Sequence, residues 1–387
     1  MAAERPPEWW HELSRRVSSR VGFVMREREL GKLRPVMERE LRGAGIEGWP
    51  AYLRELDAQP LSAAVWQSLL GHILIHETSF FRHAQQFDFV RDVILTGRDG
   101  SVRLWSAGCS SGEEAFSLAI ACLEAGRPSA EIWATDVSHA GLRRAMEGRV
   151  VLRRGEPSPR LARWVHEEAD GWHVAAPVRA LIRWQWGDLL DGAEFAARRG
   201  PFDVIMCRNV VLYLHEEAID RILAVFERAL VPDGWLMLGH AESLLFRRTS
   251  FHMVADGLAY TRRPPAPSAR RQVAEPASGE LPATPTSSEP GATVKAALAL
   301  EERGQAMEAA AHLRRGLRGD DGDLIIRLCL AGVCRRIGQT DAAADELVRL
   351  ARQLAGRPDD ELVPGGDGLT VGSLRQVVAL HVTEEAG

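Results

Sequence analysis

The sequence has no long apolar run and no excess of charge of one sign. No apolar stretch approaches the roughly 20 residues of a membrane-spanning helix, and the start, Met1 to Pro7, lacks the apolar core of a signal peptide. The formal net charge is -5, with both signs interspersed, so composition gives no argument for a nucleic-acid or membrane surface. These absences predict a cytoplasmic protein that neither inserts into a membrane nor binds nucleic acid.

Cysteine is also scarce, and its spacing matches no metal site. In a reducing compartment such scattered residues are expected to stay free thiols. We therefore predict no structural disulfide and no metal centre. The five cysteines are Cys109, Cys122, Cys207, Cys329 and Cys334.

The dinucleotide motif G-x-G-x-x-G is absent, yet residues 102–117 have the layout of a nucleotide-cofactor site: an apolar strand, a turn of small residues and a helix. Gly108 in this turn lets the backbone pass close under a ligand. The next strand ends in Asp136, whose carboxylate can accept both hydroxyls of a ribose. Two carboxylates, Glu113 and Glu114, open the helix and would repel a pyrophosphate. The pattern predicts a nucleoside cofactor without phosphate, such as S-adenosylmethionine.

A chain of 387 residues predicts two or three domains. Apolar residues recur at helical spacing before the turn, and strands alternate with helices after it, which favours a parallel sheet. A later stretch rich in Pro, Ala, Ser, Thr and Glu cannot bury a core. We predict an all-helical domain at 1–82, an α/β domain with a Rossmann-like sheet at 83–263, a disordered linker at 264–293 and helical repeats at 294–387.

Finer predictions concern individual elements. Residues 153–184 should hold a small β insertion, whose last strand, from Val178 to Trp184, leads into a main-sheet strand ending at Asp188. Residues 232–234, Pro-Asp-Gly, should stop a helix before a strand. An antiparallel hairpin should close the sheet near residue 260. Pro35 is expected near a helix start.

The tail repeats itself at a fixed period. Gly304 and Gly338 are 34 residues apart, and each is followed at the same distances by an alanine and a leucine. This period fits a pair of tetratricopeptide-like helices. A third helix, from Val371 to Leu380, should cap them. The tail offers no cofactor motif, so we expect it to bind a protein partner.

One further patch, residues 76–82, combines paired phenylalanines with polar side chains. Paired phenylalanines usually belong to a core, whereas Thr78 and Arg82 have the reach to bond a ligand. Local physical chemistry leaves packing and function open at this point.

Taken together, the region from about Trp9 to Arg263 resembles the CheR family of chemoreceptor glutamate methyltransferases. The resemblance rests on five blocks in the family's order and spacing: residues 77–82 (ETSFFR), 105–114 (WSAGCSSGEE), 134–136 (ATD), 202–213 (FD, CRNV and Tyr213) and 239–243 (GHAES).

The resemblance implies a fold, an activity and a site. The fold is a Rossmann-like methyltransferase sheet, and the activity is transfer of a methyl group from S-adenosylmethionine to glutamate side chains on the cytoplasmic helices of chemoreceptors. Arg82 and Tyr213 should stand near the transferred methyl. The cofactor pocket should be lined by His76, Thr78, Arg82, Gly108, Glu114, Asp136, Asp188, Leu189, Arg208 and Asn209.

Two positions depart from the family. His76 stands where an asparagine often precedes the Thr-x-Phe-Phe-Arg block, and Asp188 stands where an asparagine is expected to face the adenine. A carboxylate can accept from the adenine amino group but cannot donate to a ring nitrogen. These changes bear on cofactor affinity and leave the reaction type unchanged.

Two other classes of function make different predictions about the sequence. A nucleic-acid methyltransferase of the amino-methylating class would carry Asn/Asp-Pro-Pro-Tyr/Phe after its fourth strand, where this chain has Arg208-Asn209-Val210-Val211. A non-catalytic S-adenosylmethionine-binding adaptor would act through its repeats. The presence of Arg82, Asp136 and Tyr213 argues for catalysis.

Overall fold

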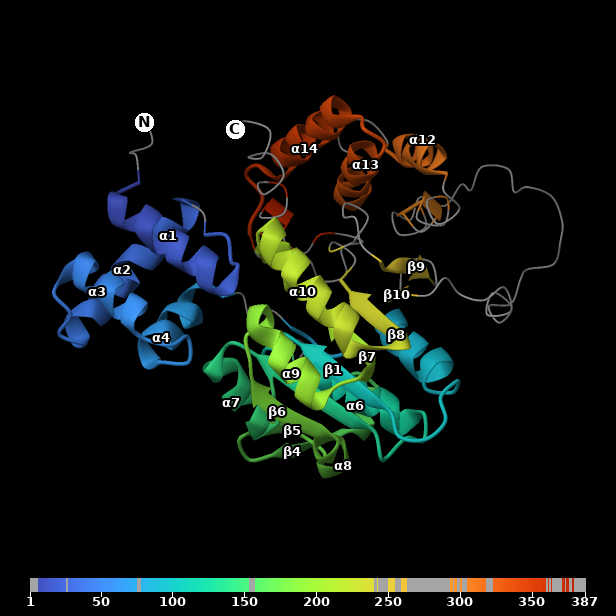
Figure 1. Ribbon diagram of the computed structural model, residues 1–387. Helices are drawn as coiled ribbons and strands as arrows, with labels where there is room; N and C mark the ends of the chain where they lie inside the picture. The colour runs from blue at the N-terminus through green and yellow to red at the C-terminus, as the bar shows by residue number, and fades with distance from the viewer. Residues whose placement is uncertain are drawn as a thin grey trace. The chain divides into compact units, whose positions relative to one another are not determined.

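The structure is a computed structural model of the chain (Figure 1). It falls into two compact units, residues 1–231 and 232–387, which are described separately. The domain boundaries expected after residues 82 and 263 stay predictions. The described residues are 6–25, 27–74, 78–152, 157–239, 242, 250–254, 259–262, 293, 294, 296, 297, 300, 305–317, 323–359, 361, 363, 371, 372, 374, 375 and 378.

The first unit begins with helices, as the apolar spacing predicts. In the first of them the buried side chains Trp10, Leu13 and Val17 follow one another at intervals of three and four residues. Pro35 lies inside the second helix and not near its start, so that prediction was wrong: the helix continues past a residue that cannot donate a backbone hydrogen bond. The elements are α1 (Glu8–Val21), α2 (Glu27–Gly43), α3 (Gly48–Ala58), α4 (Ala64–Ile73), α5 (Ala84–Phe89) and the π-helical turn η1 (Val90–Ile94).

A seven-stranded sheet in the order β6-β2-β1-β7-β8-β10-β9 forms the α/β part. The pairs β1–β2, β2–β6 and β1–β7 are parallel, and the pairs of β10 with β8 and β9 are antiparallel, as predicted. The predicted stop at residues 232–234 was wrong, because these residues lie within β8. The strands are β1 (Arg103–Ala107), β2 (Glu131–Asp136), β6 (Ile182–Trp186), β7 (Phe202–Cys207), β8 (Leu230–Leu238), β9 (His252–Val254) and β10 (Ala259–Thr261).

Helices cover both faces of the parallel strands. On one face Trp105 of β1 packs against Phe195 and Phe226, with ring centroids 4.7 and 5.3 Å away. On the other face Phe116 packs against Trp184 of β6, with centroids 5.4 Å apart. The first face carries α9 (Gly192–Arg199) and α10 (Glu216–Ala229), and the second carries α6 (Glu113–Glu124) and α7 (His139–Glu147). Short 3-10 turns are η2 (Leu161–Arg163), η3 (Leu189–Asp191) and η4 (Val211–Tyr213).

The predicted β insertion is a three-stranded antiparallel sheet in the order β3-β5-β4. Its strands are β3 (Arg149–Val150), β4 (Val165–Glu168) and β5 (Gly171–Val174). The strand expected from Val178 was wrong at its start, because residues 176–180 form the helix α8 (Ala176–Ala180), with Pro177 in its first turn. The main-sheet strand β6 ends at Trp186, two residues before Asp188.

In the second unit, the helices α12 (Ala306–Gly316), α13 (Leu324–Arg336) and α14 (Thr340–Leu354) share a core. Ala309 and Ala343, which are 34 residues apart, are both buried, and so are Leu313 and Leu347. This equivalence supports a repeat, and its assignment to the tetratricopeptide class stays a prediction. The described residues between 371 and 378 are helical, whereas the predicted linker up to residue 292 lies outside the described residues. Within the described part of the chain, no helix has the length and apolarity needed to cross a membrane.

Candidate functional site

A cavity that opens to solvent lies in the first unit at the carboxyl ends of the parallel strands. The loops after β1, β2, β6 and β7 all line it. From β1 the chain builds the sheet outward through β2 to β6, and then returns to β7 on the other side of β1. Ligands of open α/β sheets bind at such a switch point, so the topology alone marks this edge as the site.

The turn after β1 forms the floor of the cavity. Its backbone is left-handed at Gly108 (φ 83°), Ser110 (φ 51°) and Gly112 (φ 98°). A Cβ on Gly108 would come within 2.5 Å of a methyl group of Val210, which follows β7. Glycine at 108 is therefore required by the packing of Val210 as well as by the passage of the turn beneath a ligand.

Asp136, at the end of β2, holds two loops together. Its Oδ2 accepts a hydrogen bond from the Ser110 backbone N–H at 2.7 Å, and its Oδ1 accepts one from the Ser138 N–H at 2.8 Å. Asp136 also lines the cavity. The side chain both shapes the turn and presents acceptors to the cavity.

A buried pair of opposite charges lies deeper in the cavity. Glu114 at the start of α6 accepts a hydrogen bond from the Ser106 hydroxyl at 2.7 Å, and its second oxygen lies 3.9 Å from Nε of Arg208. The guanidinium of Arg208 also lies 5.2 Å from the ring centroid of Phe87. The next residue, Asn209, has φ 58°, a conformation that asparagine tolerates better than most residues. β1, α6 and β7 thus fix this pair jointly.

Asp188 stands at the far side, after β6. Its Oδ1 accepts a hydrogen bond from the Leu190 N–H at 3.0 Å. Burial raises the pKa of Asp188 to about 6, with Asp191 adding to the rise and Arg221 and Arg20 opposing it. The carboxyl is mostly ionised at neutral pH and becomes neutral in mild acid.

Comparison with known proteins shows which family this chain belongs to. Residues 76–257 match the family model described as CheR methyltransferase, SAM binding domain. The chemotaxis protein methyltransferase of Klebsiella aerogenes is 30% identical over 253 residues, which cover 60% of this chain and 82% of that protein. The probable chemotaxis protein methyltransferase of Rhizobium etli is 31% identical over 242 residues, which cover 58% of this chain and 89% of that protein. The chain belongs to the CheR methyltransferase family.

It follows that this CheR protein is an S-adenosylmethionine-dependent methyltransferase of the Rossmann-like class. A third relative, the probable biofilm formation methyltransferase WspC of Pseudomonas aeruginosa, is 28% identical over 259 residues, covering 64% of this chain and 60% of that protein. The cavity suits the cofactor on its own evidence. The turn is left-handed at Gly108 and Ser110, Asp136 lines the cavity, and the carboxylates of Glu113 and Glu114 in the first turn of α6 disfavour a pyrophosphate at that helix end.

The CheR cavity gathers the residues singled out from the sequence. Ten of the eleven lie on its wall: Thr78, Arg82, Gly108, Glu114, Asp136, Asp188, Leu189, Arg208, Asn209 and Tyr213. The eleventh, His76, lies outside the described residues. Their individual roles toward cofactor and substrate stay predictions.

Sequence reasoning missed the contribution of the segment after α1. Val21 and Phe23 line the cavity, and the ring of Phe23 lies 6.2 Å from that of Tyr213. The Val24 N–H donates to the Tyr213 carbonyl at 3.0 Å, so residues 22–24 pair with η4 as a short bridge. The residue in the sequence that could have indicated this contact is Gly22. Its φ is 72°, which favours glycine, and a Cβ there would come within 2.5 Å of Ala218.

The patch around Arg82 serves both packing and the cavity. Thr78 and Arg82 line the cavity, while Phe80 stacks on Phe116 with centroids 6.2 Å apart. Phe81 is held in a left-handed conformation (φ 49°), and its N–H donates to the Ser117 hydroxyl at 2.9 Å. The packing interpretation is confirmed for Phe80, and the role of Thr78 and Arg82 toward a ligand stays a prediction.

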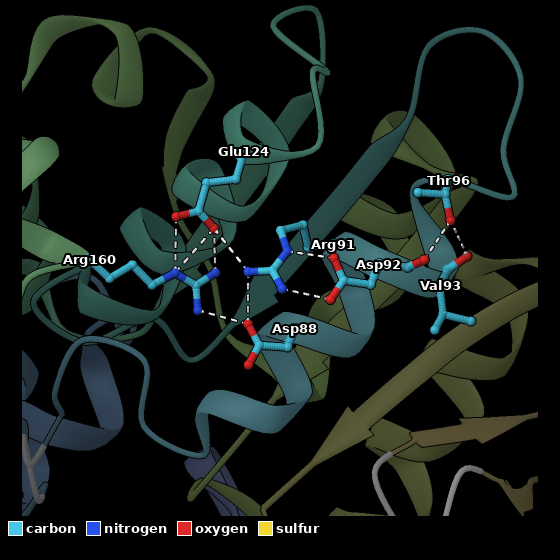
Figure 2. Close-up of polar contacts among 7 residues, drawn as sticks. All are labelled: Asp88, Arg91, Asp92, Val93, Thr96, Glu124 and Arg160. Carbon is cyan, nitrogen blue, oxygen red and sulfur yellow. Dashed lines mark hydrogen bonds and ion pairs between the residues drawn. The ribbon is translucent and has the colours of Figure 1, made fainter. Parts of the chain in front are cut away.

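An ion-pair network supports this patch from the side of the β insertion (Figure 2). Arg160 donates to Glu124 of α6 at 3.0 Å and to Asp88 of α5 at 2.9 Å, and Arg91 bonds the same two carboxylates. The guanidinium of Arg160 also lies 4.1 Å from the ring centroid of Phe81. Arg160 therefore clamps the residue that precedes Arg82, an arrangement with no signal in the sequence.

The thiol beside the cavity is not a nucleophile. Complete burial raises the pKa of Cys109 well above its ordinary value, and the nearby carboxylates of Asp136 and Glu114 add to the rise. A thiolate at Cys109 would have to form in a buried position next to two carboxylates. Cys109 packs as a small buried residue two positions after the end of β1.

Proposed function

We propose that this protein transfers a methyl group from S-adenosylmethionine to glutamate side chains of a chemoreceptor, giving glutamate methyl esters and S-adenosylhomocysteine. The observation that carries the proposal is the presence of Arg82 and Tyr213 on the wall of the same cavity as Asp136 and Glu114, in a chain similar to proteins named chemotaxis protein methyltransferases. The acceptor would lie on the cytoplasmic helices of the receptor, and the reaction would take place in the cytoplasm.

The reaction needs alignment and no general base. A glutamate side chain has an ordinary pKa of about 4.3, so it is already an anion at neutral pH. Arg82 would receive the carboxylate in a forked pair, and the hydroxyl of Tyr213 would orient one of its oxygens. A grip that is too strong would stabilise the ground state, so one arginine and one neutral donor form a suitable pair. The absence of a reactive thiol at Cys109 is consistent with direct transfer.

The remaining residues would hold the cofactor, which supplies an electrophilic methyl on a sulfonium. Asp136 would accept from the ribose hydroxyls, and Asp188 and Leu189 would face the adenine. The carboxylate of Glu114 and the guanidinium of Arg208 would face the charged amino-acid end. Because both of these side chains are nearly buried, their fields act with little screening by solvent.

The test is chemical. Receptor fragments are incubated with the enzyme and cofactor labelled in the methyl group, and the product is treated with alkali. A carboxyl methyl ester releases volatile methanol, whereas an N-methyl group stays attached. Tyr213→Phe, which keeps the ring but lacks the hydroxyl, should retain part of the activity and serves as a control. Label that survives alkali would contradict the proposal, and so would equal labelling of a fragment whose glutamates are all replaced by glutamine.

We also propose that the helices α12 to α14 bind a protein partner and keep the enzyme near its substrate. The equivalent buried positions in α12 and α14 support a repeat that offers a binding surface. A flexible linker of the length predicted for residues 264–293 would span roughly 30 Å, which would give local concentrations approaching millimolar.

The two chains to compare are the full protein and a truncation that ends at Arg263. Both are titrated with the cognate receptor over a dilution series, and binding of S-adenosylhomocysteine serves as the control for folding. We expect equal rates at high receptor concentration and a loss for the truncation at low concentration. Coinciding curves at every concentration would refute the docking role.

A further inference from the structure

The hairpin of the β insertion carries four side chains that ligate metals in other proteins. His166 and Glu168 lie on β4, Asp170 lies in the turn, and His173 lies on β5. His166 is directly opposite His173 in the antiparallel ladder, so their side chains emerge from the same face. Glu168 shares that face, because it is two residues from His166 along the strand.

These side chains already lie close together. His166 Nε2 is 2.9 Å from an oxygen of Glu168, and His173 Nε2 is 2.9 Å from an oxygen of Asp170. Ligand atoms of Glu168, Asp170 and His173 all lie within 4.8 Å of one another, and the two imidazole centroids are 6.2 Å apart. Bonds of about 2.0–2.2 Å to a tetrahedral zinc place its ligand atoms roughly 3.3 Å apart. His166 stands outside this cluster of three, and rotation of its side chain is needed to bring its imidazole to a shared ion.

We propose that His166, Glu168, Asp170 and His173 form a binding site for a divalent first-row transition metal ion such as Zn²⁺. Two imidazoles and two carboxylates are a donor set that such ions accept, whereas Mg²⁺ and Ca²⁺ prefer oxygen ligands alone. The site is open to solvent, since the side chains of His166, Glu168 and Asp170 are 51 to 60% exposed. Water can complete the coordination shell of the ion.

The surrounding charge permits a cation. Arg149 of β3 is opposite His173 in the ladder on the other side of β5, and its positive charge disfavours a metal ion. The two carboxylates of the site outnumber this one guanidinium. All four proposed ligands lie within one hairpin. A bound ion would therefore link β4, the turn and β5. β4 is an edge strand whose last three residues are exposed, so the ion would stiffen an otherwise open edge.

The competing interpretation is two separate hydrogen-bonded pairs that bind no ion. The chain supplies a matched control, because His72 makes one such pair with Glu40, at 2.7 Å. If histidine–carboxylate pairs alone accounted for uptake of metal, His72→Ala would weaken it as much as a change in the hairpin.

The experiment uses the full chain, without a histidine tag, stripped of metal with a chelator. Calorimetric titration with Zn²⁺ should show one site that the double variant His166→Ala/His173→Ala lacks. Each single variant should bind at least tenfold more weakly, and His72→Ala should bind like the unchanged protein. Binding of S-adenosylhomocysteine establishes that every variant is folded.

Two readouts locate the ion. Titration with Co²⁺ should give visible d–d bands without the near-ultraviolet charge-transfer bands of a thiolate ligand. Zn²⁺ should also slow amide hydrogen exchange in residues 165–174 of the unchanged protein and not in the double variant. Unaltered stoichiometry and affinity in the double variant, thiolate bands, or failure of the unchanged protein to take up metal would each overturn the proposal.

Discussion

Replacement of Asp136 should have two effects that can be measured separately. In the structure its carboxylate accepts hydrogen bonds from the Ser110 and Ser138 backbone N–H groups, at 2.7 and 2.8 Å. Hydrogen bonds to a charged group contribute roughly 1.5–3 kcal/mol each, and water in the open cavity can replace part of that. We therefore expect Asp136→Ala to lower the free energy of unfolding by about 2–4 kcal/mol with no cofactor bound.

The second effect of Asp136→Ala falls on cofactor affinity. Loss of the acceptor for the ribose hydroxyls should cost about 1.5–3 kcal/mol of binding, or roughly tenfold to a hundredfold in the dissociation constant. Asp136→Asn keeps one acceptor oxygen but turns an N–H group toward a backbone donor. Its stability and its cofactor affinity should therefore lie between those of the unchanged protein and those of Asp136→Ala. Urea unfolding gives the stability, and calorimetry with S-adenosylhomocysteine gives the affinity.

Asp203 supplies the matched control. Its carboxylate also accepts from a backbone N–H, that of Arg103 at 2.9 Å, and it pairs with Arg98 at 3.2 Å, but it lies at the opposite end of the strands. Asp203→Ala should lower stability and leave cofactor affinity unchanged. If the two alanine variants have the same affinity for S-adenosylhomocysteine, Asp136 is only a structural residue and the assignment of the ribose site is refuted.

Four other changes test separate parts of the site. Gly108→Ala should destabilise the protein by about 1–3 kcal/mol, measured by urea unfolding, because its Cβ would meet Val210 at 2.5 Å; an unchanged stability would refute that packing argument. Asp188→Asn should raise the free energy of unfolding by about 1–2 kcal/mol above pH 6 and have little effect near pH 4. The reason is that the folded-state pKa of Asp188 is raised to about 6, so that ionisation of this carboxyl destabilises the fold only above the unfolded value near 4. A difference between the urea curves that does not change with pH would contradict this. Arg82→Ala should lower turnover about tenfold to a hundredfold with little change in stability, and a normal single-turnover rate would exclude the role proposed for it. Arg160→Met should lower turnover severalfold at unchanged affinity for S-adenosylhomocysteine, and Arg160→Lys should have an intermediate turnover. Equal kcat values in the unchanged protein and both variants would show that the contact of Arg160 with Phe81 is irrelevant to catalysis.

The parts of the site that the sequence predicts are those at the ends of buried parallel strands. Asp136 is the last residue of such a strand, Arg208 follows one directly and Asp188 lies two residues beyond one. Parallel strands bring their carboxyl ends to one edge. The residue pattern alone assigns Asp136 to the site, whereas the assignment of Asp188 and Arg208 follows from the resemblance to the CheR family. The topology then explains why all three lie on the wall of one cavity.

The parts that could not be predicted depend on tertiary contacts. The position of Phe23 against Tyr213 follows from docking of α1, which no periodicity encodes. Arg160 reaches Phe81 from a loop of the β insertion, across 79 residues of sequence. The error at residues 176–180 was avoidable, because Pro177 favours the first turn of a helix and the apolar pattern of so short a segment fits either element.

The bridge between residues 22–24 and η4 also bears on how the protein is made. The His215 N–H donates to the Gly22 carbonyl at 2.9 Å, and the imidazole of His215 lies 3.2 Å from the Ser18 carbonyl, 197 residues earlier in the chain. At about 5–20 residues per second, a ribosome needs on the order of 10 to 40 s to synthesise that interval. Helix α1 is therefore synthesised well before residue 215 and must wait for that residue before this part of the cavity wall can form. A nascent chain halted before residue 215 has no complete site, so cofactor binding during synthesis reports that the two ends of this interval have met.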